Sequence, residues 1–186
     1  MDIGIISGRY ARALLGWAKD RGHETPVYTD MKMLAASFEN EPSLKEVLAN
    51  PVVAAATKAQ LLRNAAGIEV SEEFDRFVRL VLQHKRETLL PLMSLIYLAL
   101  YRKEKKIDRL YLSTAVPLDP AIRDRMVYEI RLKTGGSIEL TEQIRPELIG
   151  GVVMRMNNYR LDASVASQLK RVKQQLTGKN RLTEEM

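Results

Sequence analysis

The chain has 186 residues, enough for one large domain or two small ones, and its 46% hydrophobic and 28% charged residues are typical of a globular protein with a buried core. It contains no cysteine, which excludes disulfides, thiolate nucleophiles and cysteine-ligated metals. The net charge of +6 favours acidic partners: nucleic acid, anionic lipid headgroups or an acidic protein surface.

Three helices are predicted in the first fifty residues. The first ends at Gly22, and its apolar positions at helical spacing are Ile6, Tyr10, Ala13, Leu14 and Trp17. The second begins near Pro26. The pattern Ser43-Leu44-Lys45-Glu46 is that of a capping box, which predicts that a short third helix opens there and breaks at Asn50-Pro51.

Three more helices are predicted before the chain changes character. The fourth contains residues 58–66 and closes at Gly67, and the fifth opens at Ser71, a capping hydroxyl followed by two carboxylates that suit the positive end of the helix dipole. The apolar face of this fifth helix is Phe74, Phe77, Val78, Val81 and Leu82. Pro91 suits the first turn of a long sixth helix that ends near Lys103. Six helices with short connections predict an antiparallel bundle.

The hydrophobic period changes after the charged run Arg102-Lys103-Glu104-Lys105-Lys106. A β-rich segment from Ile107 to Val116 stops at Pro117, and Asp119-Pro120 then opens a helix. The side chains of this helix that we expect to point inward are Ile122, Met126, Val127 and Ile130. Residues 138–144 alternate as a strand.

The last segment predicts a hairpin followed by a helix. Gly150-Gly151 leads into the alternating run 152–156, Asn157-Asn158 predicts a tight turn, and Asp162 or Ser164 can cap the helix. The apolar positions of that helix are Val165, Leu169, Val172 and Leu176. The sequence thus predicts a mainly α protein: an N-terminal six-helix antiparallel bundle plus a small α+β C-terminal domain of order β-α-β-β-α. The predicted boundaries are 1–105 for the bundle, 106–178 for the α+β domain and 179–186 for a polar tail.

The sequence predicts neither a catalytic nor a metal-binding constellation. The glycine pairs lack the Gly-x-x-x-x-Gly-Lys-Ser/Thr pattern of a phosphate-binding loop, and no Gly-x-Ser-x-Gly nucleophile motif occurs. His23 and His84 are far apart in sequence, and neither has a second histidine at metal-ligand spacing. The acidic cluster at 72–75 is explained by its place at a helix start. We therefore expect no catalytic residue, no metal and no cofactor.

Several stretches of the chain resemble one protein family, in the order in which they occur there. Residues 146–151 (Pro-Glu-Leu-Ile-Gly-Gly) and 162–164 (Asp-Ala-Ser) resemble the delta subunit of bacterial rotary ATP synthases, called oligomycin-sensitivity-conferring protein in mitochondria. Further similar stretches are Arg9–Ala18, Leu48–Val53, Arg86–Leu92 and Ala115–Leu118. Two departures are Arg145, where the family often has an acidic residue, and Ala163, which replaces a frequent glycine.

This resemblance implies a non-catalytic stator subunit that links the catalytic head to the peripheral stalk and so couples proton-driven rotation to ATP synthesis. Its bundle would hold the N-terminal helix of one alpha subunit in a groove between the first and fifth helices. The groove residues that the resemblance implies are Tyr10, Ala13, Leu14, Trp17, Phe77, Leu80 and Val81. Periodicity alone favours the alternative that these side chains are bundle core.

The resemblance also implies that the C-terminal domain binds the C-terminal end of the b-subunit dimer. The residues assigned to this contact are Gly150, Gly151, Lys170, Arg171 and Lys173, although for the glycine pair a structural role as a strand bend is the stronger interpretation. The most apolar stretch, Leu89–Tyr101, is shorter than the roughly 20 residues that span a bilayer, and no basic leader with an apolar run is apparent. We expect a peripheral location at the cytoplasmic face of a bacterial inner membrane, reached only through the complex.

A basic helical RNA- or DNA-binding protein is the alternative that the charge of +6 suggests. The chain has no recognised nucleic-acid motif, and aromatic residues that stack on bases make up only 6% of it. We therefore expect no nucleic-acid partner.

Overall fold

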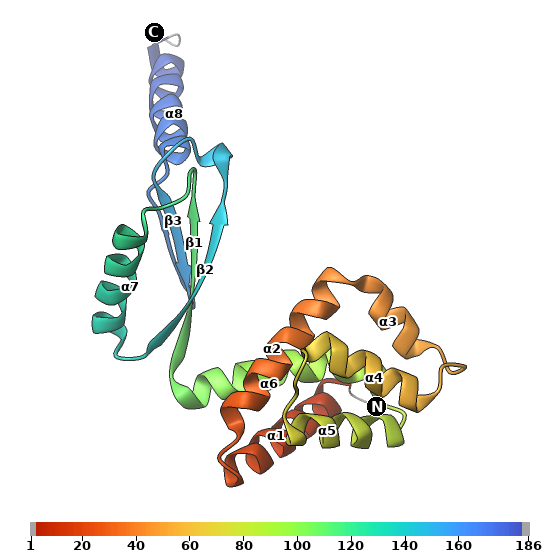
Figure 1. Cartoon of the computed structure of the whole chain (residues 1–186). Coiled ribbons are helices and arrows are strands. Elements are labelled where there is room, and N and C mark those ends of the chain that lie inside the picture. The colour runs from red at the N-terminus through yellow and green to blue at the C-terminus, as the bar shows by residue number, and fades with distance from the viewer. Residues whose placement is uncertain (1–2, 184–186) are drawn as a thin grey trace. The chain divides into compact units, whose positions relative to one another are not determined.

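A computed structural model describes residues 3–183 of the chain, with side chains described for residues 3–177. The chain divides into two compact units, residues 1–104 and 105–186. In the described part of the chain the first unit is helical, and the second combines a four-stranded mixed sheet with two helices (Figure 1). The predicted mainly α fold with a small α+β unit is confirmed.

Helices with short connections build the N-terminal unit. They are α1 (Ile3–Asp20), α2 (Glu24–Asn40), α3 (Pro42–Ala49), α4 (Ala55–Ala66), α5 (Glu72–Gln83), the 3₁₀ turn η1 (Glu87–Leu89) and α6 (Leu90–Lys105). Helices α1, α2, α4 and α5 pack against one another, and α3 packs on α2 and η1. The core side chains that are fully withdrawn from solvent include Val27, Met31, Leu34, Leu62, Phe74, Val78, Met93 and Tyr97.

Local chemistry explains several helix ends in this unit. Ser71 caps α5, since its hydroxyl accepts a hydrogen bond at 3.3 Å from the N–H three residues later. Gly67 ends α4 with a φ of 141°, a conformation that a side chain disfavours. The predicted capping box is wrong: α3 begins at Pro42, whose fixed φ suits the first helical position, and Ser43 therefore lies inside the helix.

A buried ion pair joins α3, α4 and η1. Lys58 is 4% exposed, and its ammonium donates to the carboxylate of Glu87 at 2.6 Å and to the carbonyl of Leu48 at 2.7 Å. Burial alone would raise the pKa of Glu87, but the hydrogen bond from Lys58 and the positive charges nearby outweigh burial, and the pKa is lowered. Each charge is therefore stable inside the bundle only because the other is there.

The C-terminal unit is built on a mixed sheet of strand order β2-β1-β3-β4. Its elements are β1 (Ile107–Thr114), α7 (Pro120–Thr134), β2 (Ser137–Ile144), the 3₁₀ turn η2 (Pro146–Leu148), β3 (Val152–Met156), β4 (Tyr159–Asp162) and α8 (Val165–Thr183). Strands β1 and β2 are parallel and are connected through α7, whereas β3 is antiparallel to both of its neighbours. The predicted turn at Asn157-Asn158 is confirmed, with Asn157 at a φ of 51°.

The helices of this unit are less covered than the sequence predicted. No residue of α7 is buried, and Ile122, which was expected to point inward, is 54% exposed. The expectation is wrong for Ile122, whereas Met126, Val127 and Ile130 are half-buried. Helix α8 continues to Thr183, past the predicted start of the tail at 179, and residues 184–186 lie outside the described residues.

Candidate functional site

An open apolar groove runs between α1 and α5 in the N-terminal unit. Its volume is about 390 Å³, and its lining residues are Tyr10, Ala13, Leu14, Trp17, Arg76, Phe77 and Leu80. The four residues from α1 follow the i, i+3, i+4, i+7 spacing that places side chains on one helical face. Because α1 and α5 pack together, this face of α1 and one side of α5 form the two walls of the groove.

One end of the groove is built around Tyr10. Its ring meets the Phe77 ring edge-on, with 6.4 Å between the centroids, and the His84 ring edge-on at 6.5 Å. The guanidinium of Arg86 lies 5.7 Å from the centre of the same ring. Three contacts, one from the middle of α5 and two from the residues after it, therefore hold Tyr10 at the groove.

The other end of the groove is bordered by an ionic cluster. The Arg21 guanidinium lies 5.5 Å from the centre of the Trp17 ring and 3.8 Å from the carboxylates of Glu72 and Glu73. Glu73 is only 1% exposed, and Nδ1 of His23 donates to its carboxylate at 2.9 Å. Burial alone would raise the pKa of Glu73, but the hydrogen bond from His23 and the charges of His23 and Arg21 outweigh burial and lower it. The cluster ties the end of α1 to the start of α5 and positions the indole.

Six of the seven residues predicted for this groove line it. Ala13 and Leu80 form exposed parts of the rim, with Leu80 45% exposed. Val81 is 0% exposed and faces the bundle core, because one step along a helix turns the side chain by about 100°. Its assignment to the groove is wrong. The sequence reasoning missed Arg76, although its place four residues before Leu80 puts it on the same side of the helix.

In the C-terminal unit, Gly150-Gly151 lies where the chain enters β3 beside the start of α8. Gly151 has a φ of +73°, and a Cβ there would collide with the carbonyl oxygen of Ala163. A Cβ on Gly150 would lie 3.1 Å from the Val165 side chain, and the backbone N–H of Val165 donates to the Gly150 carbonyl at 3.0 Å. The glycine pair is therefore required for close packing of the chain on itself. Direct contact of the pair with a partner stays a prediction.

Helix α8 carries an exposed apolar stripe at spacings of three and four residues. Leu169, Val172 and Leu176 are 56%, 52% and 62% exposed. The predicted partner-binding residues Lys170, Arg171 and Lys173 are exposed on the same helix. The sequence reasoning selected these basic residues and left out the stripe, because an apolar stripe in a sequence normally indicates a face that is buried within the chain.

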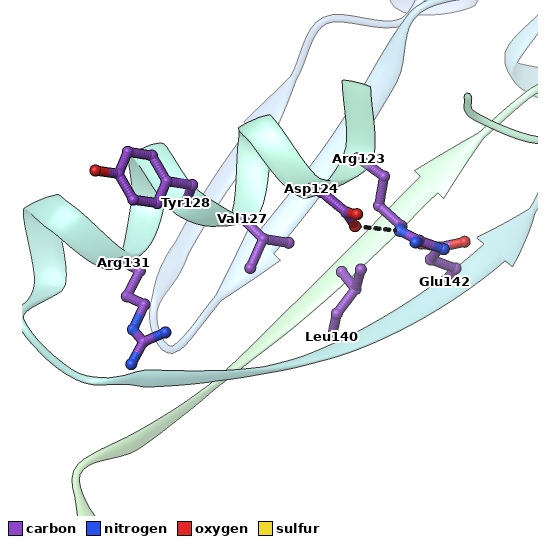
Figure 2. Close-up of a pocket in the computed structure, with 7 residues that line it drawn as sticks. All are labelled: Arg123, Asp124, Val127, Tyr128, Arg131, Leu140 and Glu142. Carbon is purple, nitrogen blue, oxygen red and sulfur yellow. Dashed lines mark hydrogen bonds and ion pairs between the residues drawn. The ribbon is translucent and has the colours of Figure 1, made fainter. Parts of the chain in front are cut away.

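A further cavity, of about 680 Å³, lies between α7 and β2 in the C-terminal unit (Figure 2). It is lined by Arg123, Asp124, Val127, Tyr128, Arg131, Leu140 and Glu142. The Nε of Arg123 donates to Asp124 at 2.9 Å and lies 3.6 Å from Glu142, and the hydrogen bond and charge of Asp124 raise the pKa of Arg123. Since these charges largely neutralise one another, we assign this cavity no ligand.

Within residues 3–183, no group of histidine and carboxylate side chains is arranged to hold a metal ion. In the same part of the chain, no helix combines the length and apolar character needed to cross a bilayer.

Two comparisons with known proteins point to one family, and a third bears on the fold. Residues 6–176 match the family described as ATP synthase delta (OSCP) subunit. The chain is 53% identical over 173 residues to the ATP synthase subunit delta of Parabacteroides distasonis, covering 93% of this chain and 96% of the relative. It is 46% identical over 182 residues to that of Phocaeicola vulgatus, covering 97% and 98%. Its fold is similar to that of a chain in the Toxoplasma gondii mitochondrial ATP synthase hexamer, with a TM-score of 0.64 and 22% identity over 92% of this chain and 97% of that chain, a likeness that bears on the fold alone.

Proposed function

The chain belongs to the ATP synthase delta (OSCP) subunit family and is a peripheral-stalk subunit, and from this premise we propose that it grips the catalytic head and the stalk with two separate surfaces. The N-terminal unit binds the N-terminal helix of an alpha subunit. The C-terminal unit binds the C-terminal end of the b-subunit dimer. Such a link keeps the head from turning with the rotor, so that proton-driven rotation is coupled to ATP synthesis.

The open apolar groove between α1 and α5 is the observation that carries this proposal. A groove that binds an amphipathic helix needs an apolar lining, against which the partner packs side chains spaced three and four residues apart. The lining residues of this groove supply such a surface. The part of α1 that lines the groove, from Tyr10 to Trp17, spans about 12 Å, the length of about two turns of a partner helix. Tyr10 and Trp17 are the aromatic side chains that dominate interface energetics, and the small Ala13 between them lets a partner backbone approach closely.

The stripe on α8 supports the proposed contact with the stalk. Leu169, Val172 and Leu176 cover about two turns of one helical face, which fits against an amphipathic partner helix. The basic residues beside the stripe would steer an acidic partner, and this attraction weakens with salt. Gly150-Gly151 acts on this contact through position, since the pair sets where α8 packs against the strand entry.

We propose no catalytic activity for the chain on its own, and a location at the cytoplasmic face of a bacterial inner membrane through the complex. The two candidate surfaces are apolar, as helix docking requires. The charge clusters around Glu73 and Arg123 contain both carboxylates and cations, which supports structural roles for them.

The test of the head contact titrates the full chain with a synthetic peptide of the alpha subunit's N-terminal helix. Trp17, the single tryptophan, is the fluorescence reporter. Leu80→Asp places a charge in the groove at an exposed side chain, so we expect the affinity to fall at least about 30-fold with little change in the free energy of unfolding. The matched control is Leu95→Asp, at a leucine 57% exposed on α6, outside the groove. Wild-type affinity for Leu80→Asp, or the same loss for both variants, contradicts the groove assignment.

The nucleic-acid alternative receives no support from the comparisons. It predicts duplex binding that falls steeply with salt. We expect no binding of duplex DNA or RNA by the wild-type chain under conditions in which the peptide saturates it.

A further inference from the structure

The two ends of the α1–α5 groove differ in charge. At the Trp17 end, the guanidinium of Arg76 pairs with Glu72, and that of Arg21 lies 3.8 Å from the carboxylates of Glu72 and Glu73. The cations at this end therefore already have carboxylate partners within the chain.

The Tyr10 end carries cations without such partners. Arg86 lies over the Tyr10 ring at 5.7 Å, and Arg9 is exposed one turn before Ala13 on the same face of α1. Among the residues that the structure describes, neither guanidinium forms an ion pair with a carboxylate. His84 adds a further exposed nitrogen base at this end, with its Nδ1–H already donated to the carbonyl of Leu80 at 2.8 Å.

The spacing i, i+3, i+4, i+7 is the same when it is reversed. The apolar lining alone therefore discriminates weakly between the two opposite directions in which a helix can bind. Charges at the rim contribute little to affinity but set orientation and suppress the wrong arrangement. Resting on the proposed head contact, we infer that the groove binds its partner helix in one direction only. The occupant is an amphipathic helix that places carboxylates over the Tyr10 end, against Arg9 and Arg86, and has no additional acidic groups at the Trp17 end.

The test uses two versions of the alpha-helix peptide that have the same apolar residues. One keeps its carboxylates only in the N-terminal half and the other only in the C-terminal half, the remaining carboxylates being replaced by carboxamides. We expect the wild-type chain to prefer one version about fivefold in low salt, the size expected for two exposed ion pairs, and to lose this preference in high salt. A nitroxide on the carboxylate-bearing end of the preferred version should leave Trp17 fluorescence largely unquenched, whereas a nitroxide on its other end should quench it.

Variants identify the cations that are responsible. Arg9→Gln combined with Arg86→Gln should abolish the preference, and the same pair of changes to Lys should keep it because the charge is retained. Arg12→Gln is the matched control: Arg12 is an exposed cation of α1 that packs beside Gly8, away from the groove lining. Equal binding of the two versions to the wild type, a preference that survives in the double Gln variant, or quenching from the carboxylate end overturns the inference while leaving the head contact intact. Failure of both versions to bind the wild type overturns the head contact and this inference with it.

Discussion

Breaking the buried pair of Lys58 and Glu87 should strongly destabilise the N-terminal unit. Lys58→Met keeps an unbranched side chain of similar length but leaves the Glu87 carboxylate, whose side chain is 14% exposed, without its cation. It also leaves the Leu48 carbonyl without the hydrogen bond that it receives at 2.7 Å. Removing one partner of a buried ion pair costs about 3–5 kcal/mol, and the residual exposure of Glu87 places our expectation near the lower figure.

Urea unfolding followed by Trp17 fluorescence measures this loss. The chain has one tryptophan, which lies in the N-terminal unit, so the signal reports on that unit. With a typical urea slope of about 1–3 kcal/mol/M, a loss of about 3 kcal/mol lowers the unfolding midpoint by about 1–3 M. The control is Lys19→Met, which removes an exposed pair with Glu104 and should cost less than about 1 kcal/mol.

The pH dependence separates charge pairing from simple loss of packing. In the wild type the pKa of Glu87 is lowered, so the stability that its charged form contributes is fully present above the unfolded pKa of about 4.3. This stability is lost as the pH falls through the folded pKa. In Lys58→Met the buried carboxyl has lost the cation that favoured its charged form, so protonation relieves the penalty. The unfolding free energies of the two proteins should therefore converge as the pH falls below about 4. A gap that is unchanged between pH 7 and pH 4, or a loss no larger than that of Lys19→Met, would refute the reasoning.

Three further predictions concern the C-terminal unit. Gly151→Ala should destabilise this unit by about 3 kcal/mol, because the residue has a φ of +73° and the added methyl meets a backbone carbonyl. Gly135→Ala is the control, since Gly135 has a φ of +68° but lies in open space, and should cost about 1 kcal/mol. Hydrogen exchange of the sheet amides measures both free energies, and equal costs would contradict the steric argument. Asp162→Asn removes the ionised acceptor for the hydroxyl and the backbone N–H of Ser164 at the start of α8. Hydrogen bonds from these groups lower the pKa of Asp162 to about 2. The difference in helical circular dichroism between variant and wild type should therefore persist through about pH 4 and vanish only as the pH approaches about 2. Leu169→Asp should abolish binding of a peptide from the C-terminal end of the b subunit without changing thermal unfolding. The control Ile122→Asp, at a similarly exposed side chain on α7, should leave binding intact. Loss of binding in both variants would mean that the stripe on α8 is not the docking surface.

Helix ends were predictable wherever they depend on the chemistry of a few neighbouring residues. Ser71 caps α5 with its own hydroxyl, and Gly67 ends α4 because it tolerates a conformation that a side chain disfavours. The error at Ser43 arose where two signals for a helix start compete. The capping pattern there is real, but Pro42 precedes it and suits the first helical position better.

The groove shows where prediction from periodicity ends. The helical period placed Phe77 and Val81 on one apolar face, yet Phe77 lines the open groove whereas Val81, which is 0% exposed, does not. The same limit applies to α8, whose stripe has the spacing of a buried face although it is open to solvent in the described chain. A helical period identifies an apolar face but not the element that covers it.

The sequence by itself determined the order of helices and strands and most of their ends, because these depend on backbone preferences and side-chain periods within a few residues. It also indicated the family, through stretches that resemble that family in the same order along the chain. Only the tertiary structure decided which apolar faces are core and which are open, and which charges meet. Lys58 and Glu87 lie 29 residues apart in the sequence, and His23 and Glu73 lie 50 residues apart, so no local sequence pattern predicts either pair. Burial and ion pairing depend on the neighbours that folding brings from distant parts of the chain, and their free energies are therefore properties of the packed structure rather than of any segment.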